Sequence, residues 1–308
     1  MTRRIVVAIP SYRRPDRLSD CLDGVELAIG ELSAASAGDE VEVVVIDNDP
    51  DGSAASVTAE RAVRYVHEPA PGLAAVRNRA LDEAEHAELL VFIDDDEVPD
   101  PAWLRELVGA FDRYDDAHGI AGRVVTPLPA DLDPWLVAVG AFVRPKRDDG
   151  QLMPTAATNN LLLELDAVRA AGVRFDPRFG MTGGEDSMFT QQFSRAGYRI
   201  RWTNAALVVE NVLPERIDRR WILMRAYRTG NSSARLRIAL AQSAAGRLSA
   251  RVGSIASGAA RVVGGSGLWA LGGVTGSLGR RARGRRAISR GSGYLSGAVG
   301  SAFREYGR

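Results

Sequence analysis

The sequence predicts an α/β fold with a mostly parallel, Rossmann-like sheet flanked by helices, followed by a helical C-terminal tail. Three observations predict it. Apolar runs of strand length alternate with amphipathic helical segments over the first hundred residues. Polar or acidic residues follow where these runs end, which is where open α/β sheets bind ligands. After residue 235 the acidic residues almost disappear, which separates a tail from the body of the chain.

Four apolar runs in the first hundred residues predict strands, because each is too short for a helix and most are rich in β-branched residues. They are Ile5–Ile9, Val41–Ile46, Val63–Val66 and Leu89–Ile93. Helices are expected from about Pro15 and from Gly72, in the segments that join them. The alternation predicts right-handed crossovers and a mostly parallel sheet.

Beyond Pro99 strands and helices follow one another less regularly. Strands are expected at Thr158–Leu163, Tyr198–Trp202 and Ala206–Glu210, and helices at residues 101–114, 166–171, 185–197 and 218–229. The proline-rich stretch Thr126–Pro134 predicts irregular structure.

The candidate site begins where the strand Leu89–Ile93 ends in four acids, Asp94, Asp95, Asp96 and Glu97. Adjacent carboxylates repel one another, and a divalent cation such as Mg²⁺ or Mn²⁺ would resolve the repulsion, because hard cations prefer carboxylate and phosphate oxygens. The alternative is a solvated acidic turn before a helix that Asp100 and Pro101 would begin.

Two other residues, one at the end of a predicted strand and one on a predicted helix, are candidates for ligand binding. Asp47, at the end of the second strand, could accept hydrogen bonds from a ribose or a base, or could cap its own turn. Arg77 could pair with Asp94 or with a phosphate, or could be a surface arginine of an amphipathic helix.

A second acidic motif lies at Gly183-Gly184-Glu185-Asp186. The two glycines permit a ligand to approach the backbone closely, and the two acids fall in the first turn of a predicted helix, where its dipole favours their charged forms. A carboxylate kept ionised in this way can serve as a general base toward a hydroxyl group. Ordinary acidic decoration of a helix N-terminus is the alternative.

Arg225 and Arg228, three residues apart on a predicted helix, share one face. They could hold a diphosphate or form a solvated basic face.

Composition suggests a cytoplasmic protein. Cys21 is the single cysteine, so no intrachain disulfide can form, and the sequence enters its first strand at Arg4 without room for a signal peptide. The net charge is zero, yet residues 236–308 contain 12 arginines and one acid, a charge of +11. An acidic body and a basic tail suggest that the tail meets an anionic surface.

Within the tail, Arg237, Arg247, Arg251 and Arg261 would share an arc of about 120° on one continuous helix. The run Val262–Gly279 follows, with eighteen uncharged residues of which seven are glycine. We expect an interfacial or re-entrant segment on the inner face of the membrane, with a helical appendage packed on the body as the alternative. The tail contains few aromatic residues for base stacking, so we expect no nucleic-acid binding.

Taken together, the motifs resemble glycosyltransferase family 2, the inverting, metal-dependent transferases of the GT-A fold. The resemblance runs from about Ile5 to Asn231 and rests on motifs in the family's order. These are Val6–Arg14, Val45–Asn48, Gly72–Asn78, Asp94-Asp95-Asp96, Gly183–Asp186 and the arginine-bearing segment Trp221–Asn231, which resembles bacterial exopolysaccharide transferases.

The resemblance implies a role for each of these positions. It implies a nucleotide-sugar site formed by Pro10, Ser11, Tyr12, Arg13, Asp47, Arg77, Asp94, Asp95, Arg225 and Arg228. It implies Asp96 and Asp94 on a divalent metal, Asp186 as the base with Glu185 as the substitute, and Asn159, Gly183 and Gly184 on the acceptor side. Many members carry a histidine after the strand that ends here at Glu210, and in its absence Glu210 is the candidate metal ligand.

The expected protein is therefore an inverting transferase that moves a sugar from a nucleotide-diphosphate donor to a hydroxyl acceptor, such as a lipid-linked glycan. Residues 1–100 would bind the donor, residues 101–235 the acceptor, and residues 236–308 the membrane. A nucleotidyltransferase of similar fold is the alternative, although the loop after the first strand lacks the glycines and lysines that hold a triphosphate. A non-catalytic scaffold of the same fold is the third reading.

Overall fold

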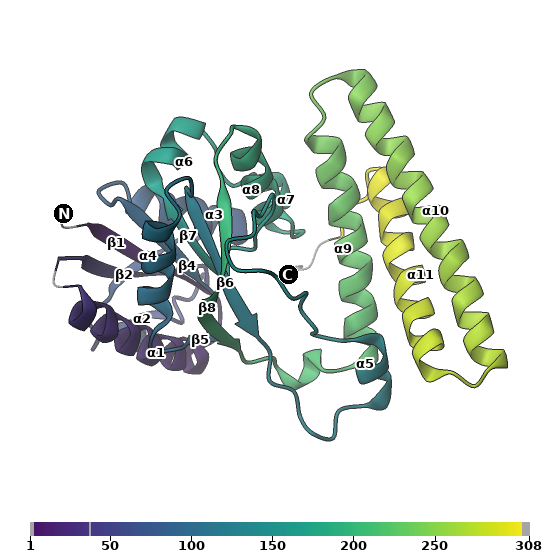
Figure 1. Ribbon diagram of the computed structural model, residues 1–308, viewed down its shortest axis with the longest axis horizontal. Helices are drawn as coiled ribbons and strands as arrows, with labels where there is room; N and C mark the ends of the chain where they lie inside the picture. Colours follow the sequence, from purple (N-terminus) through teal and green to yellow (C-terminus); the bar gives the residue numbers. More distant parts are fainter. Residues whose placement is uncertain (1–2, 37, 304–308) are drawn as a thin grey trace. The chain divides into compact units, whose positions relative to one another are not determined.

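The computed structural model describes residues 3–36 and 38–303, which belong to two compact units (Figure 1). The first unit comprises Met1–Pro127, Arg144–Gly180 and Glu185–Asn211, and the second comprises Leu128–Val143, Met181–Gly184 and Val212–Arg308. The second unit therefore includes a loop and a short helix from the middle of the sequence. The predicted boundary at residue 235 falls inside its first long helix.

The first unit is built on an eight-stranded sheet in the order β3-β2-β1-β4-β7-β6-β8-β5. Its strands are β1 (Arg4–Ser11), β2 (Glu40–Asp47), β3 (Arg64–His67), β4 (Leu89–Ile93), β5 (Glu97–Pro99), β6 (Gly119–Val125), β7 (Asn160–Glu164) and β8 (Ile200–Glu210). β1 to β4 run parallel to one another, whereas β7 lies antiparallel to β4 and β6. The predicted α/β fold with a Rossmann-like parallel half is confirmed.

Helices cover both faces of this sheet (Figure 1). They are α1 (Pro15–Ala35), α2 (Ala55–Thr58), α3 (Leu73–Glu83), α4 (Trp103–Arg113), α6 (Leu165–Ala171), α7 (Pro177–Gly180) and α8 (Glu185–Arg195). α1 and α4 pack on one face, and α3, α6 and α8 on the other. β1 alternates between the two cores, with Ile5 and Val7 on one side and Val6 and Ala8 on the other. Burial on both faces explains why the central strands read as continuous apolar runs.

Strand β6 was missed by the sequence interpretation because it contains two glycines. The structure gives the reason for Gly122: a Cβ there would lie 2.3 Å from Nδ2 of Asn160. Asn160 is 2% exposed, accepts a hydrogen bond from the Trp103 indole at 2.9 Å, and donates to the carbonyls of Arg123 and Ala206, both at 3.0 Å. Because the buried amide is fully hydrogen-bonded, it stabilises the junction of three strands and carries no penalty for an unsatisfied polar group.

Two boundaries were also wrong. The predicted strands Tyr198–Trp202 and Ala206–Glu210 form one strand, β8, which accommodates a register irregularity against β6. Helix α4 begins at Trp103, two residues after the predicted start, and Asp100 accepts a hydrogen bond from the backbone N–H of Ala102 instead of capping a helix that starts at Pro101.

The second unit is helical. It contains α5 (Pro134–Val139), the short 3₁₀ helix η1 (Pro214–Arg216), α9 (Arg219–Ala239), α10 (Ala244–Val274) and α11 (Leu278–Ala298). Asp218 and Ser243 cap α9 and α10 with side-chain oxygens that accept backbone N–H groups. α10 and α11 run side by side along most of their length, and α9 packs against α11 (Figure 1).

This arrangement corrects the predicted arginine stripe. Arg237 belongs to α9, whereas Arg247, Arg251 and Arg261 belong to α10, so the four do not lie on one helix. The glycine-rich run forms the second half of α10, the turn after it and the start of α11. Gly258, Gly265 and Gly272 are buried against α11. No helix within the described residues has the length and apolarity needed to cross a membrane.

Candidate active site

The predicted donor residues that belong to the first unit lie near one edge of the sheet. β1, β2 and β4 are parallel, so their carboxyl ends lie together, and Ser11 pairs in register with Asp47. β7 is antiparallel to β4 and begins at this edge, where Asn160 is opposite Ile93. Residues that follow β1, β2 and β4, and those that precede β7, therefore surround one site.

Asp95 joins the loop after β1 to the acidic loop. Its Oδ2 accepts hydrogen bonds from Ser11 Oγ at 3.1 Å and from the backbone N–H of Tyr12 at 3.2 Å, and its Oδ1 lies 3.1 Å from Arg14 Nη1. The same Arg14 nitrogen lies 2.7 Å from Oδ2 of Asp96. Asp95 is 4% exposed, and burial raises its pKa to about 6 despite the charge of Arg14. Asp95 therefore holds the loop after β1 against the acidic loop. Arg14, which the prediction did not include, contacts both Asp95 and Asp96.

Asp94 belongs to the same cluster and is partly exposed. The pKa of Asp94 is raised to about 6, chiefly by burial and also by the charges of Asp96 and Asp95, while the nearby Arg77 guanidinium opposes the shift. Nη2 of Arg77 is 3.6 Å from Oδ1 of Asp94, so the predicted pairing of these residues is confirmed. Burial, together with the like charges of neighbouring carboxylates, therefore makes Asp94 and Asp95 bind protons more tightly than isolated aspartates do.

Glu97 adds a buried carboxylate to the cluster. It is 1% exposed, and burial together with the charges of Asp94, Asp96 and Glu210 holds its pKa well above the usual range. Asn159 Nδ2 donates a hydrogen bond to it, so this predicted acceptor residue contacts the acidic loop. Glu97 therefore binds a proton more tightly than an exposed glutamate does.

The third predicted metal ligand, Glu210, is next to the cluster but is engaged elsewhere. Glu210 is opposite Glu97 in the pairing of β5 with β8, and its Oε2 accepts hydrogen bonds from Thr126 and Arg144 at 2.9 and 2.6 Å. Within residues 3–36 and 38–303, no three acidic, histidine or cysteine side chains are arranged as a preformed metal site. The chemistry of Asp94 and Asp96 nevertheless fits a hard divalent cation, because two carboxylates there share an excess of negative charge.

The loop after β2 uses its polar residues internally. Asp47 is fully buried and accepts hydrogen bonds from the backbone N–H groups of Asp49 and Ala54, at 2.9 and 2.7 Å. Arg13, with a positive φ of 54°, lies 3.0 Å from Oδ1 of Asp49 and so ties the loops after β1 and β2 together. Of the two readings offered for Asp47, these contacts match the turn-capping one.

Asn48, which was not assigned to the site, donates to the carbonyls of Glu68 and Ala70 at 2.7 Å and accepts from Gly72 N–H at 3.0 Å. It therefore fixes the start of α3, the helix that carries Arg77.

Arg77 connects the acidic loop to the second acidic motif. It is 4% exposed and forms an ion pair with Glu185, which is 3% exposed. Burial raises the pKa of Glu185 to about 7, although the Arg77 charge opposes the shift. Asp186, the next residue of α8, is half-buried and accepts a hydrogen bond from Ser187 N–H at 2.5 Å. The structure therefore separates the two acids: Glu185 is held by Arg77, and Asp186 is the more accessible carboxylate.

Four predicted site residues fall in the second unit. Gly183 and Gly184 both have positive φ, 74° and 100°, a backbone conformation that glycine adopts without strain. Arg225 and Arg228 lie on α9, and the guanidinium of Arg225 stacks over Trp221 at 5.2 Å.

A parallel half-sheet with crowded carboxylates at its carboxyl edge, followed by a mixed half-sheet, defines the chain as a GT-A-like α/β protein. The comparisons with known proteins agree. The family described as glycosyl transferase family 2 matches residues 6–169, and glycosyl transferase family group 2 matches residues 89–278. The chain belongs to glycosyltransferase family 2 and is a glycosyltransferase.

Among curated relatives, the succinoglycan biosynthesis protein ExoM of Rhizobium meliloti (strain 1021) is 30% identical over 243 residues, covering 76% of this chain and 75% of that protein. A solved structure of the mannosyltransferase PcManGT from Pyrobaculum calidifontis, in complex with GDP-Man and Mn²⁺, has a TM-score of 0.56 at 19% identity, covering 94% of this chain and 87% of that one.

A structure of S. aureus TarS residues 1–349 has a TM-score of 0.52 at 14% identity, covering 98% of this chain and 93% of that one. The chain spans 55% of the longer TarS structure. At these identities the two structures establish a shared fold.

Proposed function

We propose that the protein is an inverting, metal-dependent glycosyltransferase that moves a sugar from a nucleotide-diphosphate sugar to a hydroxyl acceptor in polysaccharide or cell-surface glycan synthesis. The observation that carries the proposal is the crowding of Asp94, Asp95 and Asp96 at the carboxyl edge of β1, β2 and β4. Family membership and the similarity to ExoM support it, and both favour sugar transfer over the nucleotidyltransferase alternative.

In this proposal Asp94 and Asp96 hold a divalent cation, Mn²⁺ or Mg²⁺, which would neutralise the charge of the leaving diphosphate. Asp95 and Arg14 keep the acidic loop against the loop after β1. Arg77 balances Asp94 on one side and Glu185 on the other, so it couples the position of the acidic loop to the start of α8. Pro10, Ser11, Tyr12 and Arg13 line the donor side.

Asp186 is the proposed general base. It lies in the first turn of α8 and is more accessible than Glu185. The base would take the proton of the acceptor hydroxyl as the oxygen attacks the anomeric carbon opposite the diphosphate, which inverts that centre. Glu185 is a positioning residue, because its carboxylate is buried against Arg77.

The metal assignment is tested with Asp96→Ala. This variant should lose turnover and the Mn²⁺-dependent affinity for nucleoside diphosphates, measured by calorimetry with and without Mn²⁺, while its circular dichroism stays unchanged. Glu26→Gln, which removes an exposed carboxylate from α1, is the matched control and should behave as the wild type. Metal-dependent binding that survives in Asp96→Ala would contradict the assignment.

The base assignment is tested with Asp186→Asn, which is nearly isosteric. Turnover should fall by roughly 10²–10⁴-fold while donor affinity changes little. A capping role alone predicts a stability loss of about 1 kcal/mol or less and near-normal turnover. A stable and active Asp186→Asn enzyme would show that another group is the base.

We further propose that the enzyme works in the cytoplasm on the inner face of the membrane, where a lipid-linked acceptor would be found. The second unit contains 18 arginines against five acids, a net charge of +13. α10 exposes Val252, Val263 and Val274, which are 57%, 72% and 88% exposed. From Val252 to Val274 the only charged residue of α10 is Arg261, and it is half-buried. An uncharged helix face beside many arginines suits the surface of an anionic bilayer.

Vesicle co-sedimentation tests this placement. The full chain should pellet with vesicles that contain phosphatidylglycerol, less so at high salt, because exposed charges are screened over about 8 Å at physiological ionic strength. Val263→Glu should reduce pelleting, whereas Leu27→Glu, at a 62% exposed position on α1, should not. Equal pelleting of both variants, or indifference to anionic lipid, would exclude the membrane role of α10.

A further inference from the structure

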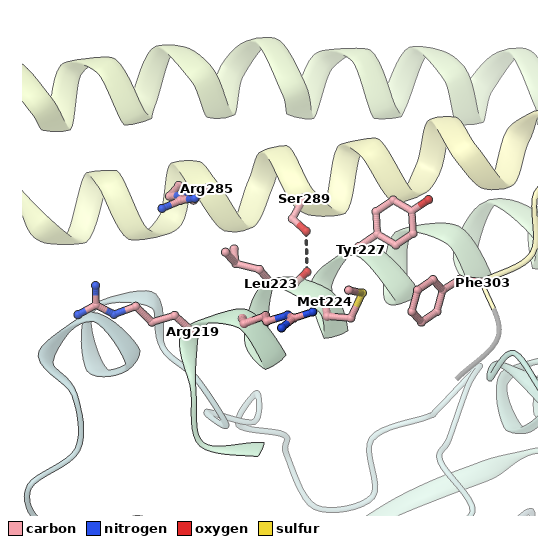
Figure 2. Close-up of a pocket in the computed structure, with 8 residues that line it drawn as sticks. Arg219, Leu223, Met224, Tyr227, Arg285, Ser289 and Phe303 are labelled. Atoms are coloured by element: carbon pink, nitrogen blue, oxygen red, sulfur yellow. Dashed lines mark hydrogen bonds between the residues drawn. The ribbon is translucent and has the colours of Figure 1, made fainter. Parts of the chain in front are cut away.

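The helical unit contains a cavity of about 640 Å³ between α9 and α11 (Figure 2). Its apolar wall consists of Leu223, Met224, Tyr227 and Phe303. Figure 2 shows Arg219 and Arg285 toward one end, with Tyr227 and Phe303 toward the other. Arg219 and Arg285 thus lie toward the end of the cavity opposite its aromatic residues.

The positive charge of the cavity is only partly balanced. Arg219 forms two hydrogen bonds with Asp133, at 2.6 and 2.9 Å. Arg220 and Arg285 also line the cavity, and neither forms an ion pair with a carboxylate in the described part of the chain. All charged residues lining it are arginines. Planar guanidinium groups bind phosphate through paired N–H donors, so a phosphate is the anion that this end suits best.

A second cavity of about 430 Å³ continues the pattern. It shares Arg219 and Arg285 with the first and adds Trp135, Trp269 and Val274 as apolar walls. The two arginines therefore border apolar surface in both cavities. An anion without an apolar group would use only part of this surface.

Close backbone contacts preform the first cavity. Ser289 Oγ donates a hydrogen bond to the carbonyl of Leu223 at 2.6 Å, which joins α11 to α9 (Figure 2). A Cβ added at Gly293 would lie 1.9 Å from the carbonyl oxygen of Tyr227, so the two helices approach as closely as glycine permits. Tyr227 and Phe303 meet edge to face at 5.7 Å. A cavity held in this way loses little conformational freedom when a ligand binds.

We propose that this cavity binds the phosphate group of a lipid, with Arg220 and Arg285 on the phosphate and Leu223, Met224 and Tyr227 against the first apolar segment of the chain. The inference rests on the proposed function and deepens it, because a phosphate-linked lipid is the carrier expected for a membrane-bound glycan acceptor. A membrane phospholipid presents the same chemistry, a phosphate ester beside an apolar chain.

The test measures binding of farnesyl phosphate to the full chain by calorimetry, with farnesol and inorganic phosphate as probes of each half alone. Farnesyl phosphate should bind more tightly than either. Arg220→Gln and Arg285→Gln should each weaken it by about tenfold or more, since each removes a charge-assisted hydrogen bond. Arg283→Gln is the matched control: it removes the same charge from an exposed site on α11 outside the cavity and should have little effect.

Met224→Glu gives a second variant that does not depend on the arginines. Met224 is 41% exposed, so the fold should tolerate the change, while the new carboxylate should repel the phosphate and weaken binding. Circular dichroism checks folding in each variant. Equal affinity of the wild type, Arg220→Gln and Arg285→Gln for farnesyl phosphate overturns the proposal, and so does a wild type that binds neither farnesyl phosphate nor phosphatidylglycerol.

Competition identifies the source of the lipid. Displacement of the protein from phosphatidylglycerol vesicles by farnesyl phosphate indicates a site that prefers the isoprenoid carrier. Arginine-dependent vesicle binding that farnesyl phosphate does not displace indicates a phospholipid headgroup site. Neither measurement uses a sugar donor, so failure here leaves the Asp96→Ala experiment on the proposed function unaffected, and the reverse also holds.

Discussion

Two neighbouring glycines of α10 should respond oppositely to the same substitution. Gly265 is buried, and a Cβ there would lie 2.9 Å from both the carbonyl oxygen of Gly284 and the backbone nitrogen of Ile288 on α11. These are backbone atoms, so relief requires the helices to move apart. Gly264, one residue earlier, has no atom within 4 Å of its added Cβ.

The size of the effect follows from two opposing terms. Alanine in place of glycine within a helix gains about 0.8–1 kcal/mol because it restricts the unfolded chain and favours helical dihedrals. Gly264→Ala should therefore raise the free energy of unfolding by up to about 1 kcal/mol. Gly265→Ala receives the same gain but also forces overpacking, which costs about 1–3 kcal/mol. The two variants should differ by about 1–3 kcal/mol, with Gly265→Ala the less stable.

Urea denaturation followed by circular dichroism at 222 nm measures the difference, because the long helices of the second unit contribute strongly to that signal. Hydrogen exchange of α10 amides gives an independent reading confined to the helix. If the glycines served only to make the segment flexible or interfacial, both variants would be stabilised alike. A stabilised Gly265→Ala protein would therefore refute the close packing of α10 on α11.

Three other perturbations test the first unit. Arg77→Met should lower the free energy of unfolding by about 3–5 kcal/mol, because it leaves Glu185 buried without its cation. Urea titrations should show a larger loss at pH 8 than at pH 6, because the raised pKa of Glu185 lets a proton neutralise its carboxylate at the lower pH. Cys21, which is fully buried and has a pKa well above the usual range, should react with a disulfide reagent only after denaturation. Arg201 and Arg199 hold the pKa of Asp116 below its usual range, so the ionised Asp116 should stabilise the fold above about pH 4. The difference in unfolding free energy between the wild type and Asp116→Asn should shrink as the pH falls below that value. A difference that does not depend on pH would exclude the ion pairs as its cause.

The central strands and the acidic loop could be predicted from the sequence because their signals are local. β4 was predicted with its observed bounds, Leu89–Ile93, since a strand buried on both faces is a continuous apolar run and the acids that follow end it abruptly. The resemblance to glycosyltransferase family 2 rested on the same local motifs, and the family comparisons confirmed it.

The sequence could not show which partner each charged side chain would choose. Arg77 was a candidate partner for Asp94, but its second partner, Glu185, is 108 residues away and meets it only because α3 and α8 pack on the same face of the sheet. The need for glycine at position 122 likewise becomes clear only in the folded sheet, where the side chain of Asn160 occupies the space that a Cβ would take. Long-range partners of this kind depend on the tertiary arrangement, for which local periodicity carries no signal.

The basic tail shows the same division most clearly. Composition alone determined that residues 236–308 are arginine-rich and nearly free of acids. The tertiary structure decided that Gly258, Gly265 and Gly272 lie where α10 and α11 touch whereas Gly264 does not, and that the arginines of this segment up to residue 303 divide among α9, α10 and α11. The physical reason is that a glycine in a helix has the same local sequence signal whether its missing side chain makes room for another backbone or faces open space, and only the neighbouring helix distinguishes the two.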